Sequence, residues 1–466
     1  MGMSVEDLVN AALAMGADYA DARYELRFSS VVVASNERIE SISIGTSRGI
    51  GVRVVANGAV GFVSTNLASD VDLGGFRRVL EGVIRSVRKA GERKEEKVVL
   101  APVPSCKDRH TWRFLVDPRD VDASEKVEIV LDATERAREF DERIANATAA
   151  VLDSLVYKRL VTSEGTDLET LTPRVAVKIL VVASEEGSMG SCARADGGIG
   201  GYELLREIGF ESLVEDACER AIKMLKAKPP PSGRFTVIAD SELTGVFIHE
   251  AVGHAVEGDL VIAGNSVLKD KLGERIASEL VTIVDDPTIE GEWGSYKYDD
   301  EGVRASKKVL VERGVLVNYI LNREAARKLG LEPNGGGRAR DFSSPPLARM
   351  SNTYLERGDW TLEEMLEDVD YGVYLRGSRG GEVDTARGSF QFNAAEAYLV
   401  ERGELTTALR GVSLSGLVLE TLANIDAVGR DLKLKIGTCV KGGQSIPVSN
   451  GGPHIRIENA VVGGVA

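Results

Sequence analysis

The chain has 466 residues, of which 43% are hydrophobic and 28% are charged. This length allows two or three domains with a sizeable core, and this composition excludes a chain that is disordered throughout. With 57 Lys and Arg against 72 Asp and Glu, the net charge of −15 argues against nucleic acid as a partner, because an acidic surface repels phosphate groups.

Neither the four cysteines nor the N-terminus suggests export. The cysteines are far apart and form no C-x-x-C pair, so we expect no disulfide framework and no zinc ribbon. The first residues lack a basic segment followed by an apolar run, and no apolar run reaches the ~18 residues of a membrane helix. We therefore expect a cytoplasmic protein with no membrane association.

The N-terminal segment predicts a helix, several strands and a second helix. Ser4 and Asp7 have the spacing of a capping box, apolar residues follow at helical intervals, and Gly16 ends the helix. Alternating segments on both sides of Asn57-Gly58 predict a β-hairpin. A charged helix over 74–97 closes a first α/β unit, which we assign to residues 1–104.

The next segment repeats this order of elements and ends at a proline run. A helix over 124–140, several strands and a helix over 211–228 form a second α/β unit, residues 105–228. The run Pro229–Pro231 cannot continue a helix and marks the clearest domain boundary. Glycine-punctuated strands dominate residues 229–466, so the expected fold class is α+β, with antiparallel N-terminal sheets and a β-rich C-terminal domain.

The stretch HEAVGHAVEGD, residues 249–259, places two of the four histidines of the chain five positions apart. The familiar zinc-peptidase motif has its histidines four apart, and on a regular α-helix a spacing of five turns the second side chain by roughly 140°. A π-type turn brings residues five apart onto one side, and Gly253 offers backbone freedom for such a distortion. We therefore predict a locally irregular helix in which His249 and His254 bind one metal ion.

Zinc suits this set of side chains, but the spacing leaves its third ligand open. A catalytic zinc site has three protein ligands and a water, and Glu250 is placed to take the proton from that water. The possible third ligands are Glu257, Asp259, Cys439 and His454. Two satisfied histidines on an amphipathic helix are the structural alternative.

Two further segments raise questions about substrate binding. Arg349 and Asn352 follow a loop rich in proline and glycine, and such loops often line sites, so both are candidates for binding a peptide backbone or carboxylate. The alternating stretch GSFQFNAAEAY, residues 388–398, is typical of an exposed edge strand to which an extended peptide could add.

Several of these motifs together resemble the TldD/PmbA family, and specifically its TldD branch. The similar segments are HEAVGHAVEGD, RMSNTYLERGDW (349–360), GGEVDTARGSFQFNAAEAYLVERGELT (380–406) and GTCVKGGQSIPV (437–448). YADARYE and GIGVRVVANGAVGFVST near the N-terminus are similar too, so the resemblance covers nearly the whole chain.

The resemblance implies a zinc metallopeptidase with His249, His254 and Cys439 as ligands and Glu250 as general base. It implies unfolded or flexible peptides as substrates and a heterodimer with a TldE-type paralogue, although a homodimer stays open. Val440 departs from the C-G-K that is common in the family after this cysteine. The alternative function is a zinc-stabilised peptide-binding or assembly module that hydrolyses nothing.

Overall fold

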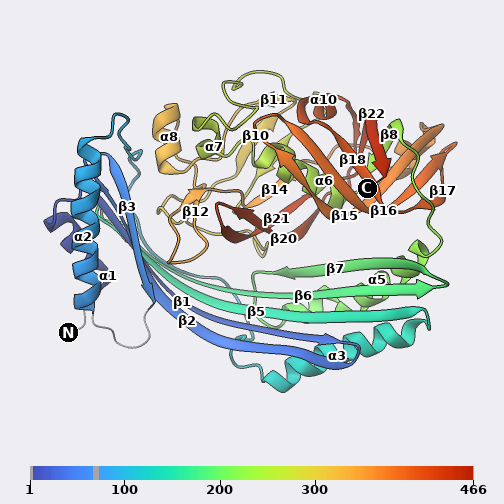
Figure 1. Ribbon diagram of the computed structural model, residues 1–466, viewed down its shortest axis with the longest axis horizontal. Helices are drawn as coiled ribbons and strands as arrows, with labels where there is room; N and C mark the ends of the chain where they lie inside the picture. The colour runs from blue at the N-terminus through green and yellow to red at the C-terminus, as the bar shows by residue number, and fades with distance from the viewer. Residues whose placement is uncertain (1–3, 67–72, 465–466) are drawn as a thin grey trace.

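The computed structural model describes residues 4–66 and 73–464. One long sheet forms the N-terminal half of the molecule, with the strand order β3-β2-β1-β5-β6-β4 and β7 paired to β6 (Figure 1). Its strands are β1 (Tyr19–Ser35), β2 (Arg38–Ala56), β3 (Ala59–Asn66), β4 (Lys107–Thr111), β5 (Ile144–Thr162), β6 (Asp167–Glu185) and β7 (Ser188–Gly198). All pairings are antiparallel except that of β4 with β6.

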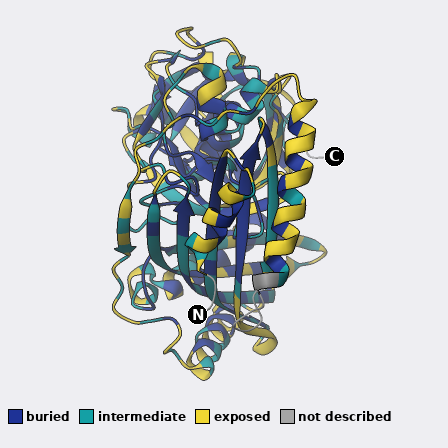
Figure 2. Cartoon of the chain, turned by 90° about the vertical axis from the view of Figure 1, so that its left-hand side faces the viewer, coloured by how far each residue is buried: buried dark blue, intermediate teal, exposed yellow. Residues whose placement is uncertain are grey.

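Local sequence signals in this half are confirmed. Helix α1 (Val5–Ala14) begins with the capping box of Ser4 and Asp7. Asn57 and Gly58 both have positive φ, 51° and 75°, at the turn of the β2–β3 hairpin, as a type I′ turn requires. Helix α2 (Leu73–Glu92) packs beside β3 and turns an exposed face outward (Figure 2).

The two α/β units predicted for residues 1–104 and 105–228 contribute to the same sheet. Strand β1 pairs with β5 from Asp21 opposite Thr162 to Ser35 opposite Thr148. Helices α3 (Ala123–Phe140), α4 (Leu204–Ile208) and α5 (Phe210–Met224) belong to the second unit, where α3 and α5 pack on the sheet and on each other. The division of this half into two domains stays a prediction.

The C-terminal half begins after the proline run and is built around a closed arrangement of strands. Strands β15, β8, β22, β18 and β16 are paired in that order, and β16 pairs back with β15; β17 adds to β16 and β19 to β22. The strands are β8 (Gly233–Ala239), β15 (Tyr371–Asp384), β16 (Ser389–Glu401), β17 (Glu404–Leu409), β18 (Val412–Leu417), β19 (Ile425–Val428) and β22 (Ile455–Gly464).

A second C-terminal sheet carries the hairpin that reaches the site described below. Its order is β11-β10-β9-β14-β21-β20. The remaining elements are β9 (Ile283–Asp285), β10 (Lys308–Glu312), β11 (Val315–Leu316), the pair β12 (Gly337–Arg338) and β13 (Leu347–Ala348), β14 (Asn352–Leu355), β20 (Lys433–Lys441), β21 (Gln444–Gly452), and helices α7 (Gly258–Ile262), α8 (Arg323–Leu329), α9 (Leu362–Glu367) and α10 (Val418–Ala423).

These sheets confirm the predicted α+β class, with an antiparallel N-terminal sheet and a β-rich C-terminal half. One expectation is wrong: residues 388–398 do not form an edge strand. Residues 389–398 belong to β16, which pairs with β15 on one side. On the other side it pairs with β18 over 389–393 and with β17 from Ala397 onward, so only 394–396 have no strand partner there among the described residues. None of the helices in the described ranges has the length and apolarity to cross a membrane.

Candidate metal centre

The two histidines lie where helix α6 (Ser241–Ile248) passes into a π-helical turn, η1 (His249–Gly253). Asp240 begins α6, because its carboxylate accepts a hydrogen bond from the N–H of Leu243 at 2.9 Å. Leu243, Phe247 and Ile248 are buried in the C-terminal core and hold the helix in place. The main chain thus presents His249 and His254 from a fixed, buried element.

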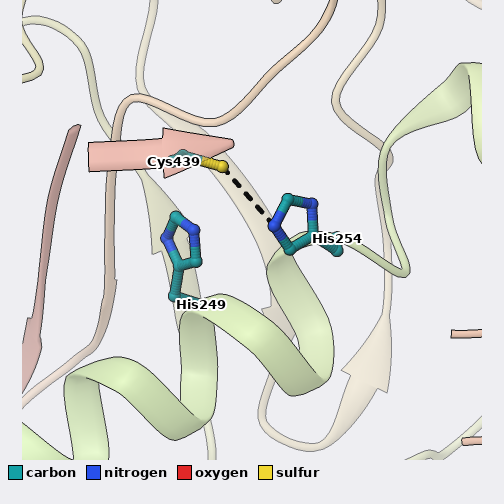
Figure 3. A group of neighbouring side chains, drawn as sticks. All are labelled: His249, His254 and Cys439. Atoms are coloured by element: carbon teal, nitrogen blue, oxygen red, sulfur yellow. Dashed lines mark hydrogen bonds between the residues drawn. The ribbon is translucent and has the colours of Figure 1, made fainter. Parts of the chain in front are cut away.

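The π turn places both imidazoles on one side of the helix. The N–H of His254 donates to the carbonyl oxygen of His249, five residues earlier, at 3.1 Å. As a result the ring centroids lie 5.2 Å apart, and the rings are nearly perpendicular (Figure 3). The predicted irregularity of the helix is therefore confirmed.

Gly253 is needed for a reason other than the predicted one. Its φ lies outside the left-handed region, so the turn does not depend on the backbone freedom of glycine. A Cβ at this position would lie 2.0 Å from Sδ of Met350, a fully buried side chain. Gly253 therefore permits close packing of the π turn against the core.

Cys439 on β20 completes the group from the other side. Its Sγ lies 3.4 Å from Nε2 of His254, and one ligand atom from each of His249, His254 and Cys439 lies within 4.8 Å of the others (Figure 3). Typical zinc bond lengths in a tetrahedral site put sulfur and nitrogen about 3.6 Å apart. Two imidazoles and a thiolate at these distances fit a three-ligand zinc site.

The other candidates for the third ligand are engaged elsewhere. Glu257 contacts the opposite nitrogen of His254, and Asp259 forms an ion pair with Nζ of Lys441 at 2.6 Å. His454 hydrogen-bonds to Asp431 at 2.6 Å in a separate cluster. Over the described residues, no second group of three His, Cys, Asp or Glu side chains converges in this way.

Glu257 fixes the orientation of His254. Its Oε2 lies 2.8 Å from Nδ1 of His254 and 2.9 Å from Nζ of Lys441, and its side chain is fully buried. Burial alone would raise the pKa of Glu257. The charges of His254 and Lys441 and their hydrogen bonds to the carboxylate have the larger combined effect, so the pKa lies below its usual value. Burial lowers the pKa of His254, and the Glu257 carboxylate together with Cys439 raises it well above its usual value.

The same surroundings favour the thiolate form of Cys439. Burial raises the pKa of Cys439, whereas hydrogen bonds to His249 and His254 and the charges of both rings lower it to about 5. These surroundings favour the thiolate, which is the form that binds a metal ion.

Glu250 lies beside the three ligands. Its Oε2 is 3.8 Å from Nε2 of His254, and 28% of its side chain is exposed, whereas His249 and Cys439 are each only 3% exposed. An acidic side chain that borders both the ligand atoms and solvent is placed for proton transfer.

Arg349 and Asn352 lie in the interior. The Arg349 guanidinium donates to the carbonyl oxygens of Cys439 at 2.8 Å and Gln444 at 3.1 Å, so it holds the β20–β21 hairpin. The Asn352 amide donates to the carbonyl oxygen of Asp286 at 2.7 Å. Both side chains are fully buried, and their assignment to substrate binding stays a prediction.

Sequence reasoning missed Lys441, although a signal for it was present. Residues two apart on a strand face the same side, so Lys441 shares the face of Cys439 on β20. Val440 points the other way and is 64% exposed. The turn that follows is made by Gly442 and Gly443, both with positive φ, so the valine leaves this turn and the position of the cysteine intact.

Three family models cover most of the chain. The PmbA/TldA metallopeptidase domain 1 matches residues 20–92, the central domain matches 116–225, and the C-terminal domain matches 232–464. The chain belongs to the PmbA/TldA metallopeptidase family. Within this family the chain is a metallopeptidase, and the C-terminal model contains all three converging side chains.

Individual relatives agree with this assignment. A metalloprotease of Methanothermobacter thermautotrophicus is 45% identical over 99% of this chain and 97% of its own length. A zinc metalloprotease TldD homolog of Saccharolobus solfataricus is 29% identical over 98% of this chain and 99% of its own length. Among solved structures, TldE from Thermococcus kodakarensis shares the fold, with a TM-score of 0.77 at 21% identity over 98% of this chain and 99% of TldE.

Proposed function

We propose that the protein is a zinc-dependent endopeptidase in which His249, His254 and Cys439 hold the metal ion and Glu250 is the general base. The observation that carries this proposal is the convergence of the three ligand atoms within 4.8 Å, with a partly exposed carboxylate beside them. A relative whose name specifies zinc supports the choice of metal.

A zinc ion at this position supplies Lewis-acid chemistry, which polarises a peptide carbonyl and makes water a better nucleophile at neutral pH. Glu250 accepts a proton from the attacking water and then delivers it to the leaving amine. Glu257 accepts the Nδ1–H of His254 and so directs the Nε2 lone pair of this ring toward the ligand cluster.

The burial of the site supports flexible peptides as substrates. His249 and Cys439 are almost inaccessible, and the exposed surface at the cluster belongs mainly to Glu250. The rigid surface of a folded protein fits poorly to ligand atoms that are shielded in this way, and a flexible segment can adapt to them better. We therefore propose unfolded or flexible peptides as the substrate class.

An exposed strand edge supports pairing with a related chain. Strand β3 pairs with β2 only from Gly49 onward, and within the described residues no strand pairs with that edge of β2 over 38–47. Ile39, Ile42 and Ile44 on this segment are 37%, 50% and 46% exposed. Because apolar strand edges are prone to pair, we propose a dimer with a TldE-type paralogue or with a second copy.

The test compares Glu250→Gln with Glu290→Gln, a control at an exposed position. We expect the first variant to bind zinc normally and to lose cleavage of a flexible peptide by at least a hundredfold, and the control to resemble the native protein. Full cleavage by Glu250→Gln would refute its role as base. The native zinc-loaded protein should also be assayed with and without its paralogue. If it binds the peptide in both cases and cleaves it in neither, the alternative function, a non-hydrolytic peptide-binding module, is favoured.

A further inference from the structure

A second site lies between the long sheet and the C-terminal half. A cavity of about 480 Å³ is bounded on one side by β5 and β6 and on the other by residues 295–300 and 338–341 and the β20–β21 hairpin. It is separate from the metal centre, because Thr438 on β20 lines the cavity whereas its neighbour Cys439 points to the opposite face of the strand.

The strand register brings cationic side chains to the cavity wall. Arg27 on β1, Val156 on β5 and Thr172 on β6 lie side by side, and Arg174, two residues further along β6, shares their face. Arg338 on β12 lines the same cavity from the C-terminal half. With Arg340, which also lines the wall, four arginines from both halves of the molecule thus border one cavity.

Two of these arginines have no carboxylate partner. Arg27 pairs with Glu25 at 2.9 Å, whereas no ion pair forms between Arg174 or Arg338 and any acidic side chain in residues 4–66 and 73–464. Arg174 donates from Nε to the carbonyl oxygen of Trp293 at 3.1 Å and lies over that ring. Its two Nη groups therefore have no acceptor from the described part of the protein.

Arg338 is fixed in a similar way. Its Nη groups donate to the carbonyl oxygens of Met350 and of Pro447, the latter at 2.8 Å, and its guanidinium lies 4.9 Å from the centre of the Tyr296 ring. It is 6% exposed. Carbonyl groups and aromatic rings therefore hold both arginines in place without neutralising their charge.

The lowered pKa of Arg174 agrees with an excess of positive charge around the cavity. Burial, followed by the charges of Arg338 and Arg27, lowers the pKa of Arg174 to about 9, with Glu25 acting in the opposite sense. Arg174 is half-buried, and a charge that is partly withdrawn from water without an anionic partner is costly, so an anionic ligand would lower this cost.

The acidic residues of the wall have partners of their own. Asp299 accepts hydrogen bonds from the backbone N–H groups of Glu301, Val303 and Gly337. Asp300 pairs with Lys158, and Asp341 with Arg340. These carboxylates are therefore engaged and leave Arg174 and Arg338 to an external anion.

We propose that this cavity binds an oxyanion, a carboxylate or phosphate group, through the guanidinium groups of Arg174 and Arg338. The planar fork of arginine matches two oxygen atoms of either group, and the hydroxyl groups of Ser154, Thr170 and Thr172 line the wall beside it. The cavity volume falls within the usual range for small-ligand pockets, ~300–1,000 Å³.

Tryptophan fluorescence of the full-length protein can test this proposal, because Trp112 and Trp293 line the cavity. The probes are inorganic phosphate, a short acetylated peptide with a free C-terminal carboxylate, and the same peptide with an amidated C-terminus. We expect saturable binding of phosphate, of the free-carboxylate peptide, or of both, and none of the amidated peptide. Whichever of the two binds identifies the source of the oxyanion.

Variants decide whether the arginine carries the binding. Arg174→Gln should weaken binding at least tenfold, and Arg327→Gln, at an exposed position, should leave it unchanged. Equal binding by native protein and Arg174→Gln, binding of the amidated peptide as tightly as the free acid, or no saturable response to either oxyanion would overturn the proposal. This readout requires no peptide cleavage, so it is independent of the proposed peptidase mechanism.

Discussion

The carboxylate of Glu257 lies 2.8 Å from Nδ1 of His254, while Nε2 of the same ring lies 3.4 Å from Sγ of Cys439. The imidazole is therefore held between a buried carboxylate and the ligand cluster. A carboxylate at this position selects the tautomer whose other nitrogen can bind a metal ion and makes that nitrogen more basic.

Replacing Glu257 should weaken metal binding without removing a ligand. In Glu257→Gln, the side chain no longer carries the charge that polarises His254, and Lys441 loses one of its two carboxylate partners. We expect zinc affinity to fall by about 10–100-fold. Competition with a chromophoric chelator measures this change. Unaltered affinity would show that Glu257 has no such role, and Glu290→Gln serves as the control.

Gly253 should tolerate no added methyl group, because a Cβ there would collide with Met350. We expect Gly253→Ala to lower the free energy of unfolding by about 1–3 kcal/mol. In helix α2, a Cβ added at Gly82 would have no atom within 4 Å, so Gly82→Ala should raise the free energy of unfolding by about 1 kcal/mol. The double variant Gly253→Ala, Met350→Ala should lose less unfolding free energy than the two single variants lose together. Chemical denaturation measures these free energies. Strict additivity would contradict the predicted collision.

Arg349 should act on the metal centre through the β20–β21 hairpin. A lysine at this position lacks the planar fork that holds the carbonyl oxygens of both Cys439 and Gln444. We expect Arg349→Lys to lower zinc affinity by about tenfold, while Arg327→Lys has no effect. If Arg349 instead binds substrate, the variant will keep its zinc affinity and raise KM, so the two measurements separate these roles.

The Asp431–His454 pair predicts a pH dependence of stability. Burial raises the pKa of Asp431, but hydrogen bonds from His454 lower it to about 2. Because the pKa is lower in the folded than in the unfolded state, ionised Asp431 stabilises the protein above its ordinary pKa of about 4, and this contribution is lost as the pH falls toward 2.

The difference in unfolding free energy between native protein and Asp431→Asn should therefore shrink as the pH is lowered from 6 toward 3. In a His454→Gln background the same substitution should show a smaller dependence on pH. A difference that stays constant with pH would contradict the lowered pKa. Urea titrations at several pH values give these free energies.

The sequence identifies local features of this site better than long-range ones. The spacing of His249 and His254 predicts the π turn, because no regular helix lets both rings bind one ion. Only the fold brings Cys439 to them from β20, so spacing cannot separate this cysteine from Glu257, Asp259 or His454. The resemblance to known proteins, and not periodicity, singled it out.

Other features of the fold also lie beyond a local pattern. Residues 388–398 alternate in polarity, as an edge strand does, yet β16 forms hairpins with both of its neighbours in sequence, β15 and β17, and also pairs with β18. Alternation within one strand does not show how many partners that strand has. Arg349 lies in a segment that looks like a surface loop, and only the tertiary structure buries it. Likewise, the pairing of β1 with β5 is invisible to any local pattern.

X-ray absorption spectroscopy at the zinc edge tests the central claim most directly. For the zinc-loaded protein we predict one sulfur atom at about 2.3 Å and two imidazole nitrogen atoms at about 2.0–2.1 Å. In Cys439→Ser the sulfur contribution should disappear, and in Cys192→Ser it should remain. A native spectrum without sulfur, or one that is unchanged in Cys439→Ser, would contradict a centre built from His249, His254 and Cys439.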